Sequence, residues 1–329
     1  MPMLLEAANA VPIHTAGAAL VVADYGAAQG RNSLEPMRAV IKVIRARTAE
    51  PVPIAVVHTD IPGNDFSALF TLVETSDASY LSGTVNVFPY AAGQSFYRQL
   101  FPPGQVSLGW SAIAVHWLSK APTTIPGHIW SPRATGAALQ AFQQQARADW
   151  EAFLQHRAVE MKPEARLVVI GGAADDQGNS GANGLMDMVN AVLQDLVREG
   201  LLTAEEHGRM VIPTYNRMAR EYLQPFENGA AGGLRLERHE LTILPDPIWA
   251  AFQSSGQADV FAAAYVDFFE AAFGPSIFTV IEKSRSEPER QKVKEAFSKK
   301  LRDRILTDPA QAVCRWHLFT MLIAKPSGA

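Results

Sequence analysis

Two segments that each end a buried apolar run have the residue types of a nucleotide-binding site. In Asp24-Tyr25-Gly26-Ala27-Ala28-Gln29-Gly30-Arg31-Asn32, two glycines let the backbone turn sharply and approach a ligand. The run Ile54–Asp60 ends in a second acid, and an acid at the end of the second strand of a nucleotide-binding fold accepts hydrogen bonds from ribose hydroxyls. Asp24 would lie near the charged end of the cofactor. A carboxylate there tolerates a sulfonium and repels a pyrophosphate.

The glycine spacing argues against other nucleotides. The dinucleotide pattern G-x-G-x-x-G and the phosphate-loop pattern G-x-x-x-x-G-K-[ST] are both absent from the turn after Asp24. A nicotinamide-dependent oxidoreductase is therefore disfavoured. The lone D-x-G-x-x-x-G pattern remains compatible with a tight strand-to-helix turn that binds no ligand.

Further segments follow in order along the chain. They are Asp60-Ile61-Pro62-Gly63-Asn64-Asp65-Phe66, Ser95-Phe96-Tyr97-Arg98-Gln99-Leu100-Phe101-Pro102 and His116-Trp117-Leu118-Ser119. With the turn after Asp24, they resemble the SABATH family of S-adenosylmethionine (SAM)-dependent carboxyl methyltransferases, in particular a bacterial-like member. The family includes plant salicylate, jasmonate, benzoate and caffeine-pathway enzymes. The resemblance continues through Glu199-Gly200-Leu201 and Ile212-Pro213-Thr214-Tyr215 and covers nearly the whole chain from residue 20.

The resemblance implies a role for each matched residue. It implies that SAM is the cofactor and S-adenosylhomocysteine (SAH) its product. The residues expected to line the methionine end are Asp24, Gly26 and Asn32. Asp60 takes the ribose hydroxyls and Ile61 packs against the adenine, while Ser95 and Phe96 complete the adenosine pocket. Trp117 corresponds to the tryptophan whose indole N–H donates to the acceptor carboxylate, although a large aromatic at this position is also compatible with a core residue on a helix.

The acceptor side departs from the family pattern. Ile113 stands where many members have a tyrosine, and His116 where salicylate-type members have methionine. Leu185 and Met186 align with an aliphatic–tryptophan pair of the plant pocket. The family's N-terminal arm is expected to be shortened or missing, and no glutamine precedes Gln29. His116 either contacts the acceptor, as a hydrogen-bond partner or a base, or points away from it.

Composition restricts the partners. The chain has 329 residues, a formal net charge of −4 and no basic tract, so we expect a small carboxylic acid as acceptor and no nucleic-acid partner. The apolar run 16–23 is too short to span a membrane. The single cysteine, Cys314, indicates a reducing, cytoplasmic setting and an inert core position. No histidine–acid cluster indicates a metal, and His58 is expected to be structural, close to Asp60. A homodimer is expected only by analogy with related enzymes.

The pattern of apolar runs predicts the elements that position these residues. Continuous apolar runs indicate strands buried on both faces; they are expected at residues 18–24, 54–60, 79–88, 106–115, 166–172, 234–244 and 314–324. Helical spacing is expected after Ser33, as the helix cap, and over residues 135–157, 186–202 and 246–308. The fold class is therefore α/β: a Rossmann-like methyltransferase sheet with helices on both faces and a helical cap. Residues 1–244 with 311–329 form the core, and 245–310 the cap, to which the helix at 184–202 contributes.

These observations favour transfer of a methyl group from SAM to the carboxylate of a small organic acid, giving a methyl ester. A carboxylate is ionised at neutral pH and needs no general base, so positioning is the main task of the protein. Two alternatives remain: a phenol or nitrogen methyltransferase of the same fold, with His116 as base for a phenol, and a SAM-binding protein without transfer activity.

Overall fold

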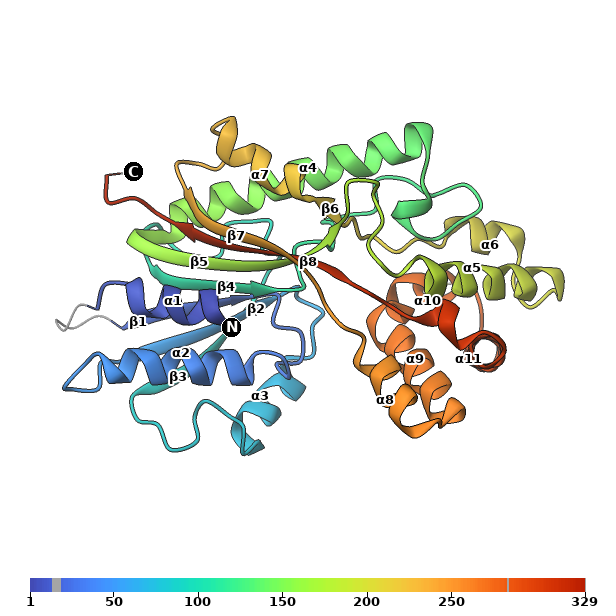
Figure 1. The fold of residues 1–329 in the computed structure, drawn as a ribbon, viewed down its shortest axis with the longest axis horizontal. Helices are drawn as coiled ribbons and strands as arrows, with labels where there is room; N and C mark the ends of the chain where they lie inside the picture. The colour runs from blue at the N-terminus through green and yellow to red at the C-terminus, as the bar shows by residue number, and fades with distance from the viewer. Residues whose placement is uncertain (14–18, 283, 329) are drawn as a thin grey trace.

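A computed structural model describes residues 1–13, 19–282 and 284–328 as an α/β structure around one large sheet (Figure 1). The strands are β1 (Leu20–Tyr25), β2 (Ile54–Asp60), β3 (Val87–Gly93), β4 (Val106–Ala112), β5 (Met161–Ala174), β6 (Arg217–Met218), β7 (Arg235–Ile243) and β8 (His317–Ala324). The helices of the first two-thirds of the chain are α1 (Pro2–Ala10), α2 (Leu34–Ala46), α3 (Phe66–Thr75), the 3-10 turn η1 (Ser131–Arg133), α4 (Gly136–Glu160), α5 (Asn183–Arg198), α6 (Ala204–Arg209) and α7 (Ala219–Glu227).

The strand order places the carboxyl ends of β1, β2 and β4 next to one another. The order is β3-β2-β1-β4-β5-β8-β7, with β6 paired to β5. Strands β3 to β5 are parallel, whereas β8 runs antiparallel to both β5 and β7. The order reverses direction between β1 and β4, and ligands of such sheets bind outside the carboxyl ends of the strands at this switch point.

Helices cover both faces of the sheet, as the sequence predicts. On one face α2 buries Met37, Val40, Ile41 and Ile44 at helical spacing, and α1 packs beside it on the same side. On the other face α4 buries an aromatic stripe that packs with α7 against β5 and β8. Figure 1 shows α1 and α2 on one side of the strands, with α4 and α7 on the other.

A group of helices lies between β7 and β8, beyond the carboxyl ends of the parallel strands (Figure 1). These elements are α8 (Pro247–Ser255), α9 (Ala258–Ala272), α10 (Gly274–Glu282), α11 (Glu287–Thr307) and the 3-10 turn η2 (Pro309–Ala312). They share one apolar cluster with α5, to which Leu193, Tyr265, Phe269 and Phe297 belong. We refer to α8–α11 as the cap helices. Over the described residues no single helix is long and apolar enough to cross a membrane, and only α9 and α10 taken together, bent by 63°, pass that composition test.

Several local expectations are wrong for identifiable reasons. The third strand, expected near residues 79–88, is β3 and begins only at Val87. The residues before it are turn-rich, and Gly83 and Asn86 have left-handed backbone angles of φ +69° and +57°, which do not fit an extended strand. Ser33 precedes α2 but its side chain makes no capping hydrogen bond. The first strand begins at Leu20, and residue 18 of the expected strand lies outside the described residues.

Two further expectations concern residues near the ends of elements. Cys314 is buried, as expected, but it lies before β8 rather than within it. Trp117 lies in a loop after β4, where it forms an isolated bridge with Thr214, and not on a helix. The N-terminal residues form α1, which contacts α2 and β5.

Candidate functional site

Asp24 is fixed at the end of β1 by a buried hydrogen-bond chain. Its carboxylate lies 2.7 Å from Nδ1 of His58, and Nε2 of the same ring lies 2.9 Å from the Tyr80 hydroxyl. Asp24 and His58 are opposite each other in the parallel register of β1 and β2. His58 is therefore structural, as expected, but its partner is Asp24. Asp60, the acid expected near His58, lies two residues further along the same strand β2, whereas the acid that contacts the imidazole is Asp24 of the neighbouring strand β1.

The turn after β1 brings three separate segments into contact. Gly26 has φ +85°, and a Cβ built on it would lie 2.4 Å from Cβ of Ala114 and 3.4 Å from the Phe96 ring. Only glycine fits such a close approach with a left-handed backbone. The loop after β1, the loop containing Phe96 and the loop after β4 therefore meet at one point on the carboxyl edge of the sheet.

Asp60 organises the loop above that turn. Its Oδ2 accepts a hydrogen bond of 2.7 Å from the Ala28 N–H, and its Oδ1 accepts one of 2.8 Å from the Ile61 N–H. Asn64 donates to the Ala28 carbonyl at 2.7 Å, so Ala28, at φ +48°, is held from both sides. Each carboxylate oxygen retains a free lone pair for a hydroxyl donor. The Ile61 side chain is 57% exposed beside it, as an apolar surface for a flat ring.

Ser95 and Phe96 belong to a loop whose backbone is hydrogen-bonded to the buried ion pair of Arg157 and Glu160. Ser95 and Phe96 are half-buried, and the Phe96 ring lies edge-on to Phe153 of α4 at 5.8 Å. Asn32 is exposed at the end of the turn after β1. Arg157 and Glu160 are completely buried 2.7 Å apart; Arg157 donates to the Phe96 carbonyl at 2.8 Å.

Glu160 completes that support. It accepts hydrogen bonds from the Leu100 N–H at 2.5 Å, the Phe101 N–H at 3.3 Å and the Tyr25 hydroxyl at 3.1 Å. Sequence reasoning missed this pair. The available signal was the position of Arg157, seven residues after Trp150 on the buried face of α4, where a charge requires a partner.

The acceptor side begins with a strained residue. Ile113 directly follows β4, has φ +54° and is 45% exposed, while its N–H donates to the Ile170 carbonyl at 2.7 Å. A β-branched residue in this region is a genuine outlier, and such strain accumulates where a site fixes the backbone. Ile113 thus presents its side chain at the carboxyl edge beside β5.

His116 is buried and kept neutral. Burial, assisted by the positive charge of Arg217, lowers its pKa to about 4. Its Nδ1 has no hydrogen-bond partner among the described residues. Arg217 itself is buried; it donates to the Val115 carbonyl at 2.6 Å and the Ala146 carbonyl at 2.6 Å. Arg217 was not anticipated from the sequence, because it is a hundred residues from the loop that it supports.

Trp117 joins the sheet to the cap helices. The Tyr97 hydroxyl donates to the Trp117 carbonyl at 2.5 Å, and the Trp117 ring lies 5.8 Å from the Phe273 ring. The indole is half-buried and its N–H makes no hydrogen bond with the described residues. Trp117 therefore offers a fixed, unoccupied donor at the place where the cap helices meet the loop after β4.

Leu185 and Met186 lie inside an apolar core cluster against which Trp117 also packs. Both are on the first turns of α5, have no exposed surface, and pack within the apolar cluster shared with α9 and α11. Their predicted contact with the acceptor remains a prediction. Among the described residues, no group of three or more His, Cys, Asp or Glu side chains could hold a metal ion.

Comparison with known proteins identifies the class. The family model for SAM-dependent carboxyl methyltransferases matches residues 1–305. The chain is 33% identical over 215 residues to a probable 7-methylxanthine methyltransferase 3 of Theobroma cacao, covering 61% of this chain and 58% of that protein. It is 28% identical over 273 residues to gibberellic acid methyltransferase 1 of Arabidopsis thaliana, covering 74% of this chain and 70% of that protein.

The fold agrees with this match. A solved structure titled loganic acid methyltransferase with SAH superimposes with a TM-score of 0.74 at 19% identity, covering 99% of this chain and 92% of that one. The chain thus belongs to the SAM-dependent carboxyl methyltransferase family, and the resemblance seen in the sequence is confirmed. The match spans less than two-thirds of the length of the cacao relative.

Proposed function

We propose that this protein transfers a methyl group from SAM to the carboxylate of a small organic acid, giving a methyl ester and SAH. The observation that carries this proposal is the combination of two features. Asp60 and the turn after β1 form an ordered edge that suits the cofactor, and the acceptor side pairs the indole N–H of Trp117 with His116, a histidine of lowered pKa that is a weak base. Family membership supports the cofactor, and the names of the gibberellic acid and loganic acid relatives support a carboxylate acceptor.

The cofactor edge fits SAM. The oriented carboxylate of Asp60 suits a ribose diol, and exposed Ile61 suits the adenine face. The close contact of Gly26 with Ala114 and Phe96 fixes the turn beside this edge. Asp24, held by His58, suits the charged methionine end together with Gly26 and Asn32, and Ser95 and Phe96 complete the proposed adenosine pocket. SAM supplies an activated methyl group on a sulfonium.

The acceptor side suits a group that is already ionised. The free indole N–H of Trp117 can donate to one carboxylate oxygen and so aim the other at the methyl group. Alignment of this kind contributes on the order of 7–11 kcal/mol to lowering a barrier. We further propose that residues 245–310, with the helix at 184–202, act as a cap domain that closes over the acceptor and excludes water. The contact between Trp117 and Phe273 supports this role.

The burial of His116 argues against a phenol acceptor. With its pKa lowered to about 4, His116 is a weak base at neutral pH, far from the pKa of about 10 typical of a phenol. A nitrogen acceptor remains the second candidate, because the cacao relative is named for a methylxanthine. His116 and Ile113 are then proposed as residues that shape the acceptor pocket.

Methyl transfer from isotopically labelled SAM to a panel of small acids, phenols and xanthines tests the proposal. We expect label in base-labile methyl esters. Label only in phenol ethers or N-methyl products would overturn the carboxylate assignment, and SAM binding without transfer to any compound would indicate a binding protein.

We also propose a cytoplasmic location and a homodimer. The single buried cysteine, whose pKa burial raises to about 12, suits a reducing compartment, where disulfides are rare. The dimer is proposed by analogy with related enzymes. Light scattering on the purified protein tests the dimer, and cell fractionation tests the location.

A further inference from the structure

The two edges of the sheet differ in how they can be extended. β3 forms one edge and β7 the other, so each has one side without a neighbouring strand among the described residues. β3 contains Pro89, which cannot donate a backbone hydrogen bond, and proline is a common means of blocking an edge strand. β7 contains no proline and is exposed along nearly its whole length. β7 is therefore the edge that keeps its outward backbone donors for another strand.

The side chains of β7 differ between its two faces. In the register with β8, Arg238 lies opposite Leu322, which packs with α1 and α2, and Glu240 lies two residues further along on the same face. Leu241 and Ile243 lie on the other face and are 45% and 56% exposed. The edge thus has charges of opposite sign on one face and uncovered apolar side chains on the other.

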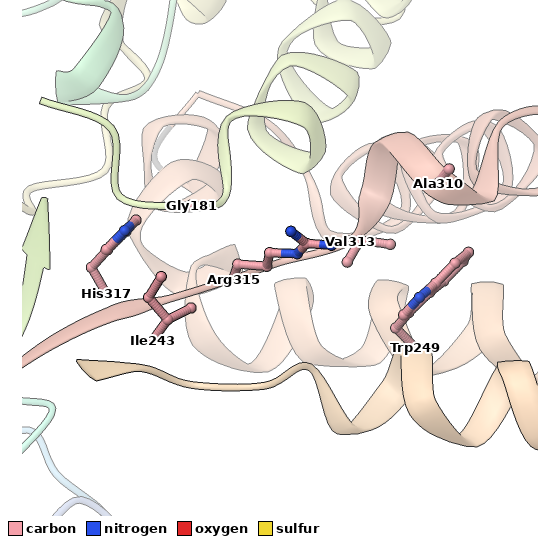
Figure 2. Close-up of a pocket in the computed structure, with 7 residues that line it drawn as sticks. All are labelled: Gly181, Ile243, Trp249, Ala310, Val313, Arg315 and His317. Atoms are coloured by element: carbon pink, nitrogen blue, oxygen red, sulfur yellow. The ribbon is translucent and has the colours of Figure 1, made fainter. Parts of the chain in front are cut away.

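The apolar face of β7 ends at a pocket of about 400 Å³ (Figure 2). Ile243 lines this pocket together with His317, which lies opposite it on β8, and with Trp249 of α8. Figure 2 shows the Ile243 and His317 side chains next to each other. Leu244, the next residue, is 46% exposed. Large apolar side chains that gather uncovered in this way indicate a surface that contacts another molecule.

The charged side chains of β7 can reach a second molecule. Glu240 is exposed and makes no hydrogen bond or ion pair within the described part of the chain. Arg238 contacts Glu6 of α1 at 3.2 Å, but both side chains are about half exposed, and a surface pair of this kind contributes little to stability. The guanidinium has several N–H donors, so this contact leaves donors for a second carboxylate.

We propose that β7 pairs with β7 of a second copy of this chain, in an antiparallel register with the twofold axis at His239. Antiparallel pairing about one residue places its two flanking residues opposite each other. Arg238 of each copy then faces Glu240 of the other, so two ion pairs form at once. A twofold interface requires a surface that is complementary to itself in this way. This inference rests on the proposed homodimer, for which it names the surface.

The charges of β7 select this register. Strand β7 is irregular between Leu236 and Arg238, and bulges and charges commonly protect an edge from pairing. Registers centred on Arg238 or on Glu240 would place like charges opposite each other, which is destabilising. The register about His239 places opposite charges together, and Leu241 then lies opposite the irregular segment of the other copy.

Charge reversal followed by sedimentation velocity tests the pairing. Glu240→Arg replaces two attractive contacts with two repulsive ones, so we expect the dimer Kd to rise about 10–100-fold. Arg238→Glu should have the same effect. The double variant Arg238→Glu/Glu240→Arg restores opposite charges and should recover most of the wild-type affinity. Glu205→Arg, the same charge change at an exposed position of α6, is the matched control and should leave Kd unchanged.

Cysteine cross-linking tests the register. In His239→Cys the two introduced thiols lie directly opposite each other across the axis, with Cβ atoms about 4.5–5.5 Å apart, which a disulfide can close. The natural Cys314 is buried and should not react. Leu241→Cys is the control, because its two copies would lie more than about 10 Å apart along the strands. We expect a disulfide-linked dimer under mild oxidation only for His239→Cys.

Three results would overturn the inference while leaving the homodimer intact. They are a dimer that Glu240→Arg does not weaken, a folded double variant that does not recover the dimer, and a disulfide that forms at Leu241→Cys instead of His239→Cys. Thermal melting shows that each variant is folded. If the wild-type protein sediments as a monomer at every concentration, the homodimer fails and the inference fails with it. Neither result bears on the methyl acceptor.

Discussion

The buried pair Arg157–Glu160 gives a prediction whose size follows from the structure. Glu160→Gln keeps one oxygen acceptor and nearly the same volume, but it leaves the Arg157 guanidinium without a counterion at a position with no exposed surface. Removing one partner of a buried ion pair costs about 3–5 kcal/mol. At about 2.1 cal/mol/K of unfolding entropy per residue, 329 residues convert this cost to a fall in Tm of about 4–7 °C.

The same substitution should also weaken SAM binding. Glu160 holds the Leu100 and Phe101 N–H groups, and Arg157 holds the Phe96 carbonyl, so both sides of the loop at residues 95–102 depend on the pair. We expect SAM affinity to fall about tenfold, because a hydrogen bond to a charged group is worth about 1.5–3 kcal/mol. Differential scanning calorimetry measures the first effect and titration calorimetry with SAM the second.

A double-mutant cycle isolates the pair. Arg157→Met with Glu160→Gln removes both charges, so the double variant should be less destabilised than the sum of the two single variants by at least about 1 kcal/mol. The matched control is Arg147→Met with Glu151→Gln, an exposed pair at i, i+4 on the same helix, which should change stability by less than about 1 kcal/mol. A Glu160→Gln variant as stable as wild type would refute the reasoning.

Three further predictions concern the cofactor, the acceptor and pH. Asp60→Ala should weaken SAM binding about tenfold or more in calorimetry, since Asp60 also holds the Ala28 and Ile61 N–H groups; unchanged affinity would contradict the assignment. Trp117→Phe keeps the ring against Phe273 but removes the indole N–H, so acceptor kcat/KM should fall while SAM affinity is retained; equal losses would indicate a structural role. His116 has its folded pKa lowered to about 4 from an unfolded value of about 6.5, so its contribution to stability is complete above pH 6.5 and decreases by roughly 3 kcal/mol towards pH 4. His116→Asn should flatten that part of the stability–pH curve, and an identical curve would show that another group titrates there.

Local patterns were sufficient for the cofactor side. Asp24 and Asp60 end apolar runs, and runs of this kind became β1 and β2 because strands buried on both faces require them. The loop residues Gly26, Ser95 and Phe96 meet as expected because parallel strands align their carboxyl ends at one edge.

Partners distant in the sequence could not be predicted. The Asp24–His58 contact depends on the register between β1 and β2, and the hydrogen bond from Arg217 to the Val115 carbonyl depends on how β6 returns to β5. Neither the strand register nor the path of β6 can be recognised from a short segment of sequence. The late start of β3, which was expected near residues 79–88, has a different cause: the composition before Val87 suits a strand, but Gly83 and Asn86 adopt left-handed angles in the preceding turn.

The position of the cap helices has an evolutionary consequence. The chain leaves the sheet at the end of β7 and returns at the start of β8. The two connecting segments lie side by side, because the Leu244 N–H donates a hydrogen bond of 2.8 Å to the Trp316 carbonyl. An insertion whose entry and exit are adjacent can be exchanged between relatives without altering the strand order. The surfaces that face α5, α6 and Trp117 must be inherited with it, because α11 contacts α5, α10 contacts α6 and Phe273 contacts Trp117. Under the proposed role of the cap helices, replacement of this one insertion would change the range of acceptors and leave the proposed cofactor edge unchanged.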